Sequence, residues 1–182
     1  MKKKMLLHAC CGPCASGVIQ QLEDYDLTIL YYNPNIDTLE EYNKRYEALE
    51  IIVNEMNKEF NYDIKLIYIP YNHDEFSTKI KGLENEKEGG IRCDICFGIR
   101  LDFVGKYAKD NNFDIFASTL SVSPHKDYIK INTIGESVSK KYGSQYYPSN
   151  FKKNNGFLLS IQNSKKYGIY RQNYCGCKKN ED

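Results

Sequence analysis

Seven cysteines fall into three groups that lie far apart in a chain of 182 residues. The groups are Cys10, Cys11 and Cys14; Cys93 and Cys96; and Cys175 and Cys177. A Cys-x-x-Cys pair at the start of a helix offers two thiolates to one metal, and the free N–H groups there stabilise their negative charge. Two such pairs can close around one ion or one iron–sulfur cluster. The cysteines therefore predict metal or redox chemistry rather than buried free thiols.

The first group contains Cys11-Gly12-Pro13-Cys14, which is also the dithiol motif of thioredoxins. A thioredoxin-like exchanger would leave the other cysteines without a role, so we disfavour it. Four thiolates suit zinc as well as iron, and both metals stay open at this point. Cysteines beyond four favour a redox role, because a closed zinc site has no use for them.

The last group, Cys175-Gly176-Cys177, has a single residue between its sulfurs. A disulfide across this spacing would be tight and easily reduced, as catalytic pairs are, and Gly176 would give the backbone the freedom it needs. The alternative is that one or both sulfurs bind a second metal ion.

The composition predicts one folded α/β domain spanning residues 1–182, since hydrophobic residues make up 41% and charged residues 27%. The net charge is +1, but the charge is uneven. Residues 152–179 are rich in lysine and arginine and contain no acidic residue, and the next acid in the chain is Glu181. This basic segment could meet phosphates or be a solvated surface. The apolar run after Lys4 is too short for a signal peptide, and no stretch is long enough to cross a bilayer. We therefore expect a cytoplasmic protein, whose thiols stay reduced.

Strands and helices alternate along the chain. Strands are expected at 4–9, 27–32, 64–69, 114–117 and, weakly, 145–147; helices are expected at 15–22, 38–56, 74–81, 97–107, 129–142 and 156–166. Pro13 suits a first helical turn, and Thr38 with Glu41 forms a capping box. This order predicts a Rossmann-like parallel sheet with helices on both faces. The turn at 10–14 and the loop at 118–126 should then meet at the carboxyl edge of the sheet.

Four motifs together carry a resemblance to a known family. They are His8-Ala-Cys-Cys-Gly-Pro-Cys14; Arg92-Cys-Asp-Ile-Cys-Phe97 with Arg100-Leu101; Ser118-Thr-Leu-Ser-Val-Ser-Pro-His-Lys126; and Tyr170-Arg-Gln-Asn-Tyr-Cys-Gly-Cys177. In this order, over nearly the whole chain, they resemble the QueH-type epoxyqueuosine reductases. The resemblance implies reduction of epoxyqueuosine, at the wobble position of tRNA, to queuosine with loss of water. It also implies the adenine-nucleotide alpha-hydrolase variant of the Rossmann fold, which is related to PP-loop enzymes.

The resemblance further implies cofactors and partners. A [4Fe-4S] cluster would be held by Cys10, Cys11, Cys93 and Cys96, and Cys175 with Cys177 would be a redox-active pair. A relative in which a separate iron lies beside the cluster makes Cys14 a candidate ligand of a second mononuclear iron. The substrate would be tRNA carrying epoxyqueuosine, and an external donor would have to supply two electrons, one at a time through the cluster.

Protonation of the epoxide oxygen requires an acid, and the candidates are Asp94, His125 and His8. Asp94 could instead cap a helix, and His8 could fill the end of a strand. Arg92 and Arg100 could balance cluster charge, grip tRNA phosphate or form ordinary surface pairs.

Two other functions stay open. A PP-loop-like tRNA-modifying enzyme would need a glycine-rich pyrophosphate loop after the first strand, where cysteines stand here. A zinc- or iron-binding module that binds tRNA without catalysis would use the same cysteines.

Overall fold

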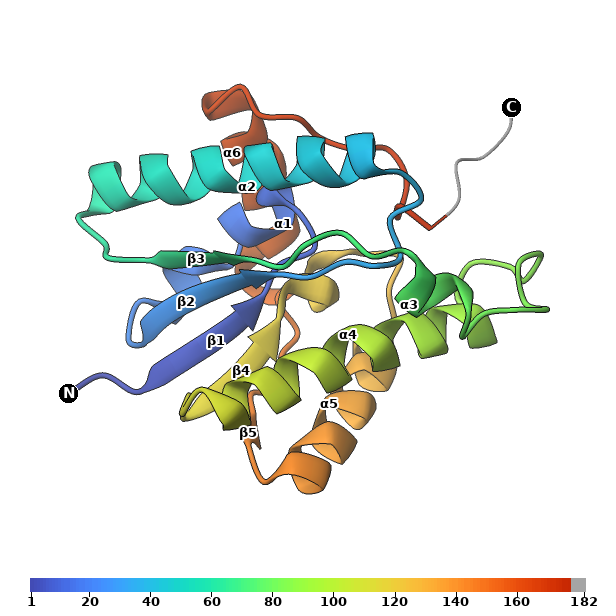
Figure 1. Cartoon of the computed structure of the whole chain (residues 1–182). Helices are drawn as coiled ribbons and strands as arrows, with labels where there is room; N and C mark the ends of the chain where they lie inside the picture. Colours follow the sequence, from blue (N-terminus) through green and yellow to red (C-terminus); the bar gives the residue numbers. More distant parts are fainter. Residues whose placement is uncertain (178–182) are drawn as a thin grey trace.

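A five-stranded parallel sheet forms the centre of the computed structural model, which describes residues 1–177 (Figure 1). The strands are β1 (Lys4–His8), β2 (Asp26–Tyr31), β3 (Lys65–Tyr68), β4 (Ile115–Ser118) and β5 (Gln145–Tyr146). They lie in the order β3-β2-β1-β4-β5, and every neighbouring pair is parallel. The chain therefore builds outward from β1 to one edge and then crosses to the other side. This confirms the predicted Rossmann-like sheet, whose switch point lies between β1 and β4.

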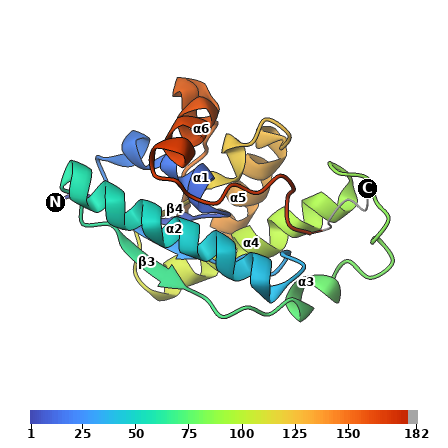
Figure 2. The ribbon, with the colours of Figure 1, turned by 90° about the horizontal axis from the view of Figure 1, so that it is seen from above.

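Helices cover both faces of the sheet (Figures 1 and 2). One face carries α1 (Gly12–Ser16), α2 (Leu39–Phe60) and α6 (Gly156–Lys166); the other carries α3 (Asp74–Ser77), α4 (Ile91–Asp110) and α5 (Tyr128–Tyr142). Short 3₁₀ turns occur at Ile19–Leu22, Thr119–Val122 and Lys153–Asn155. None of these helices combines the length and the apolarity that crossing a membrane requires.

Two apolar cores result from the alternation of side chains along β1. Met5 and Leu7 pack into the core beneath α1 and α2, whereas Leu6 packs with Phe116 into the core beneath α4 and α5. Successive residues of a strand face opposite sides of a sheet, so a strand buried on both faces is apolar at every position. Cys10 belongs to the second core, and this brings the cysteine turn against α4.

Local sequence signals predicted some helix ends correctly and others wrongly. The Thr38 hydroxyl accepts a hydrogen bond from the Glu41 N–H at 3.2 Å, as the capping box predicted. The predicted helix at 15–22 is wrong, since α1 ends at Ser16 and the chain then passes close to α6. A Cβ on Gly17 would lie only 2.1 Å from the carbonyl oxygen of Gly156. The predicted helix at 74–81 is also shorter and ends at Ser77.

Candidate metal centre and adjoining pocket

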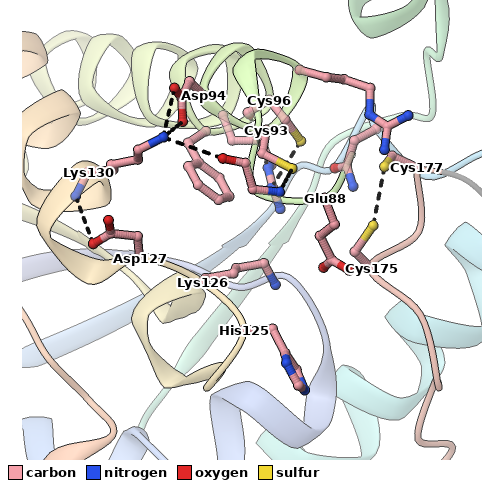
Figure 3. A pocket seen from close by; sticks show the side chains of 15 residues that line it. Glu88, Cys93, Asp94, Cys96, His125, Lys126, Asp127, Lys130, Cys175 and Cys177 are labelled. Carbon is pink, nitrogen blue, oxygen red and sulfur yellow. Dashed lines mark hydrogen bonds and ion pairs between the residues drawn. The ribbon is translucent and has the colours of Figure 1, made fainter. Parts of the chain in front are cut away.

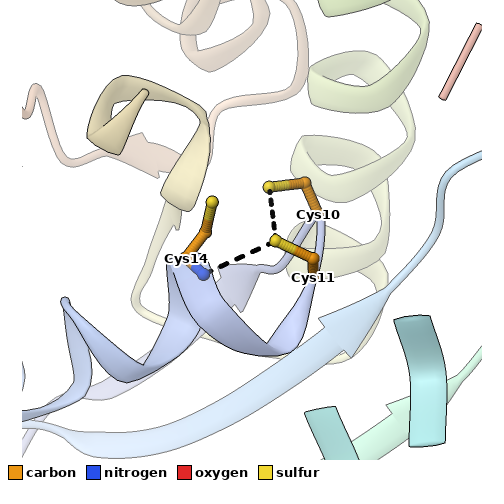
Figure 4. A group of neighbouring side chains, drawn as sticks. All are labelled: Cys10, Cys11 and Cys14. Atoms are coloured by element: carbon orange, nitrogen blue, oxygen red, sulfur yellow. Dashed lines mark hydrogen bonds between the residues drawn. The ribbon is translucent and has the colours of Figure 1, made fainter. Parts of the chain in front are cut away.

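Three sulfur atoms lie together in the turn that follows β1 (Figure 4). The ligand atoms of Cys10, Cys11 and Cys14 are all within 4.8 Å of one another. Cys11 caps α1, its sulfur accepting from the Cys14 N–H at 3.5 Å, and Pro13 occupies the first turn as predicted. Cys11 is fully buried and Cys10 is 7% exposed. Three soft ligands at this spacing can share one metal ion or one corner of a cluster.

Hydrogen bonds among these thiols divide their protons unequally. Donation from the Cys11 and Cys14 thiols holds the pKa of Cys10 well below its usual range. The same bond to Cys10 raises the pKa of Cys11 to about 12, and the pKa of Cys14 is raised for the same reason. Cys10 therefore holds its proton less tightly than Cys11 and Cys14 do, and a bound metal would displace the protons of all three.

Cys93 and Cys96 lie on the first turns of α4, one helical turn apart. Cys93 accepts a hydrogen bond from the Gly89 N–H at 3.2 Å, and Cys96 accepts one from Arg100 Nη2 at 3.1 Å. Burial raises the pKa of Cys96, and the nearby Arg100 charge opposes this effect. Cys96 is part of the buried cluster that contains Cys10 and Cys11, and Cys93 packs against that cluster. The fold therefore brings the first two cysteine groups into one core.

Cys175 and Cys177 are free thiols whose sulfur atoms lie 3.2 Å apart (Figure 3). The bond from Cys177 lowers the pKa of Cys175 to about 5, and the same interaction raises the pKa of Cys177. Gly176 adopts φ 107°, a conformation that favours glycine, so it supplies the backbone freedom that the sequence predicted. Both cysteines line a pocket together with Cys93 and Cys96.

This pocket holds about 500 Å³ of space, including its open mouth, and charged side chains stand across it from the sulfurs (Figure 3). Asp94 makes an ion pair with Lys130, its Oδ1 lying 3.0 Å from the lysine Nζ. Lys126 lies in the loop after β4, and the exposed His125 beside it lies on the side of the pocket away from Cys96. Asp94 and His125, two of the three predicted acids, thus line the same pocket.

The third predicted acid, His8, is fully buried at the end of β1. Its Nε2 donates to the Tyr32 carbonyl at 2.9 Å, and its Nδ1 accepts from the Ser118 hydroxyl at 2.9 Å. Burial lowers the pKa of His8 to about 4, so the ring is neutral. His8 ties the ends of three neighbouring strands together, and it is not among the residues that line the pocket.

The two arginines of α4 are buried rather than paired on the surface. Arg92 is 7% exposed and Arg100 is 3% exposed, and neither forms an ion pair within residues 1–177. Arg92 donates from Nη1 to the Glu84 carbonyl at 2.7 Å. Arg100 donates from Nη2 to the Cys96 sulfur.

The basic segment is only partly free to meet phosphate. Lys166 pairs with Glu59 at 2.5 Å, and Arg171 stacks over the Phe157 ring. Lys152 donates to the Lys126 carbonyl at 2.9 Å, close to the pocket. The predicted tail lysines Lys178 and Lys179 lie outside the described residues.

Several residues of the site were missed by sequence reasoning. Arg45 donates to the carbonyls of Cys175 and Tyr174 at 3.1 and 3.2 Å, while its Nε binds Glu41 at 2.7 Å. The sequence did offer a signal for Arg45. Glu41 and Arg45 are four residues apart on the side of the α2 helix that faces the core, which indicates a buried ion pair. Gln172, whose side chain partly offsets the raised pKa of the Cys11 thiol, lies within the last of the four motifs but was assigned no role.

Comparison with known proteins agrees with this architecture. Solved structures with a similar fold include "U34-tRNA thiolase NcsA from Methanococcus maripaludis with its [4Fe-4S] cluster", with a TM-score of 0.53 and 15% identity, covering 98% of this chain and 62% of that one. A "predicted subunit of tRNA methyltransferase" from Methanocaldococcus jannaschii gives a TM-score of 0.51 and 13% identity, covering 91% and 74%. These likenesses concern the fold alone, and they agree with the predicted Rossmann-like α/β fold.

Sequence relatives are much nearer. The family model described as "Epoxyqueuosine reductase QueH" matches residues 5–181. Relatives of that name are 41% identical in Staphylococcus aureus (strain Mu50), over 97% of this chain and 75% of the relative, and 39% identical in Streptococcus pyogenes serotype M1, over 97% and 70%. The relative in Thermotoga maritima is 34% identical over 95% of this chain and 88% of its own length. The four motifs therefore predicted the family correctly: this chain belongs to the epoxyqueuosine reductases of the QueH type.

Proposed function

We propose that this reductase acts on tRNA carrying epoxyqueuosine, through a [4Fe-4S] cluster held by Cys10, Cys11, Cys93 and Cys96. The observation that carries the proposal is the burial of Cys10, Cys11 and Cys96 in one core, with Cys93 packed against it. When bound, the cluster would pass electrons singly from an external donor towards the substrate. Reduction of the epoxide consumes two electrons and two protons, and it yields the alkene and one water.

The donor set fits such a cluster. Each of the four sulfurs accepts a hydrogen bond. Cys10 accepts from the Thr119 hydroxyl, Cys11 from the Cys14 N–H, Cys93 from the Gly89 N–H, and Cys96 from Arg100. Hydrogen bonds to the ligand sulfurs are a main control of cluster potential. The buried Arg100 charge also offsets the negative charge that four thiolates bring into an apolar core.

We assign Cys175 and Cys177 to the redox step. Their sulfurs are close enough to form a bond after a small movement, and that oxidation would release two electrons and two protons. These are the quantities that epoxide reduction consumes, so one turnover could be matched by one disulfide, which the external donor would then reduce. Cys14 lies beside the proposed cluster ligands and is our candidate ligand for a second, mononuclear iron.

The pocket would take the modified base after it swings out of the anticodon loop, as base-directed enzymes require. Asp94 and His125 are the candidates for protonating the leaving oxygen. Lys126 and Lys130, which line the pocket, are our candidates for contacting the flanking phosphates. We likewise propose a cytoplasmic location, in keeping with a tRNA substrate, and a single catalytic domain at residues 1–182.

Anaerobic turnover of tRNA bearing epoxyqueuosine, with dithionite as donor, tests the proposal directly. We expect queuosine to form with the cluster-loaded wild type, and we expect Cys93→Ala to lose visible absorption, acid-labile sulfide and activity together. Ser139→Ala, on α5, is the control and should change none of them.

Two results would contradict the proposal. Colourless protein with stoichiometric zinc would favour the tRNA-binding zinc module. Absorption that survives Cys93→Ala would show that the ligand set is wrong.

A further inference from the structure

Two deeply buried polar atoms on the pocket wall lack a hydrogen-bond partner. They are the side-chain oxygen of Asn35, a residue 2% exposed, and the Nε of Arg92, a residue 7% exposed. Buried polar groups in folded proteins are nearly always paired, because an unmade hydrogen bond costs folding free energy. An unpaired acceptor and an unpaired donor among the residues that line one pocket therefore indicate a polar ligand.

The surroundings of Asn35 are firmly held, so looseness of the turn does not explain the missing partner. The carbonyls on either side of it, on Pro34 and Ile36, accept hydrogen bonds from His73 and Tyr71 at 2.8 and 2.9 Å. The Asp37 N–H donates to the Gly176 carbonyl at 2.8 Å, which fixes this turn to the Cys175–Cys177 segment. Asn35 thus stands beside the proposed redox pair on a rigid frame.

Arg92 is fixed in the same way from the other side. It lies on the first turn of α4, next to Cys93, and its Nη1 is bound to the Glu84 carbonyl. This bond orients the guanidinium and leaves Nε–H free to donate. Arg92 therefore belongs to the helix that carries the second cysteine group, and Asn35 lies in a loop that is hydrogen-bonded to the third.

The pairing of an acceptor with a donor selects the chemistry of the ligand. A hydroxyl group can donate to the Asn35 oxygen and accept from Arg92 Nε, or two hydroxyls can each satisfy one of them. A phosphate or carboxylate would satisfy Arg92 but would set its negative charge against the Asn35 oxygen. The site thus fits a neutral, hydroxylated group.

We infer that Asn35 and Arg92 bind the ring hydroxyls of the substrate and so hold its epoxide towards the sulfurs. The inference rests on the proposed function, in which the modified base enters this pocket. The cyclopentane ring of epoxyqueuosine carries hydroxyls next to the epoxide, and the unmodified deazaguanine has no such ring. Asn35 and Arg92 then determine which wobble base is accepted.

Binding of two tRNAs to the cluster-loaded protein, without reductant, tests this inference. One tRNA carries epoxyqueuosine and the other carries the same deazaguanine base without the cyclopentane ring. We expect the wild type to prefer the first by about 10- to 100-fold, and Asn35→Leu to bind the two within about threefold. Iron content should stay unchanged in the variant.

Asn150→Leu is the matched control, since the Asn150 oxygen is also buried without a partner but does not line the pocket. It should keep the wild-type preference. If Asn35→Leu does not fold, Arg92→Lys keeps the charge, loses the Nε–H donor and should show the same loss.

Undiminished preference in a folded Asn35→Leu or Arg92→Lys would overturn the inference while turnover by the wild type upheld the proposed function. Failure of the loaded wild type to make queuosine would instead remove the proposed function, and the binding comparison would still decide the role of Asn35.

Discussion

At the scale of single residues, the four proposed cluster ligands are accompanied by hydrogen-bond donors from three parts of the chain. Thr119 follows β4, Cys14 lies in α1, and Gly89 and Arg100 lie just before and within α4. The spacing of the cysteines in the sequence was the signal for the proposed cluster ligands. Their hydrogen-bond donors could not be predicted from the sequence. Thr119 and Cys10 are 109 residues apart, and they meet only because β1 pairs with β4.

Arg100 should raise the reduction potential of the proposed cluster. Its positive charge and its bond to Cys96 favour the reduced, more negative state, and a hydrogen bond from a charged donor is worth about 1.5–3 kcal/mol. We therefore expect Arg100→Met to lower the potential by roughly 60–130 mV, and Arg100→Lys to lower it less. A redox titration followed by absorption and EPR measures this.

Lys106→Met is the control for this experiment. Lys106 lies on the same helix but is exposed and paired with Asp110. Equal potentials for Arg100→Met and Lys106→Met would show that Arg100 does not act on the cluster.

At the scale of elements, the first cysteine turn depends on a close approach between α1 and α2. A Cβ on Gly12 would lie 2.6 Å from the carbonyl carbon and oxygen of Ala48, which are backbone atoms that cannot turn aside. The glycine between Cys11 and Pro13 is therefore required by packing, in addition to any role in the dithiol motif.

Gly12→Ala should push α1 away from α2 and disturb the three-sulfur turn. Overpacking of this kind costs about 1–3 kcal/mol of the free energy of unfolding, and we expect iron loading to fall with it. Chemical denaturation and iron analysis measure the two effects.

Gly98→Ala on α4 provides the comparison, since nothing lies within 4 Å of a Cβ there. Alanine is the better helix former, so this variant should be neutral or slightly more stable. A Gly12→Ala protein as stable and as iron-rich as Gly98→Ala would contradict the packing argument.

The elements also show where prediction from the sequence stopped. The strands, the Thr38 cap and the Pro13 start were predicted because their signals are local in the chain. The end of α1 was not, because it depends on the contact of Gly17 with Gly156, which exists only after α6 has packed. The strand order was not predicted either. The alternation of strands and helices indicated only the class of fold, a parallel sheet covered on both faces.

At the scale of the whole molecule, the site is completed by a segment that returns to it from the far end of the chain. Arg45 of α2 holds the carbonyls of Tyr174 and Cys175, and Glu41 in turn holds Arg45. The Tyr170 hydroxyl adds a bond to Glu41 at 2.9 Å. A buried ion pair near the start of a long helix therefore positions the Cys175–Cys177 segment, the proposed redox pair.

Arg45→Lys separates this anchoring role from the ion pair. Lysine can still pair with Glu41, but it has no planar fork with which to hold two carbonyls at once. We expect Cys175 and Cys177 to be alkylated about tenfold faster by iodoacetamide, as followed by mass spectrometry, because loss of one or two hydrogen bonds makes opening of the segment that much easier. Iron content should stay near the wild-type value, since Arg45 contacts none of the four proposed cluster ligands, whereas reductase activity should fall.

Lys44→Met, which alters an exposed neighbour on the same helix turn, should leave the alkylation rates unchanged. Unchanged rates in Arg45→Lys as well would mean that the other contacts of the segment, those of Tyr170 with Glu41 and of Tyr174 and Gly176 with Asp37, hold it without the Arg45 bonds to the two carbonyls.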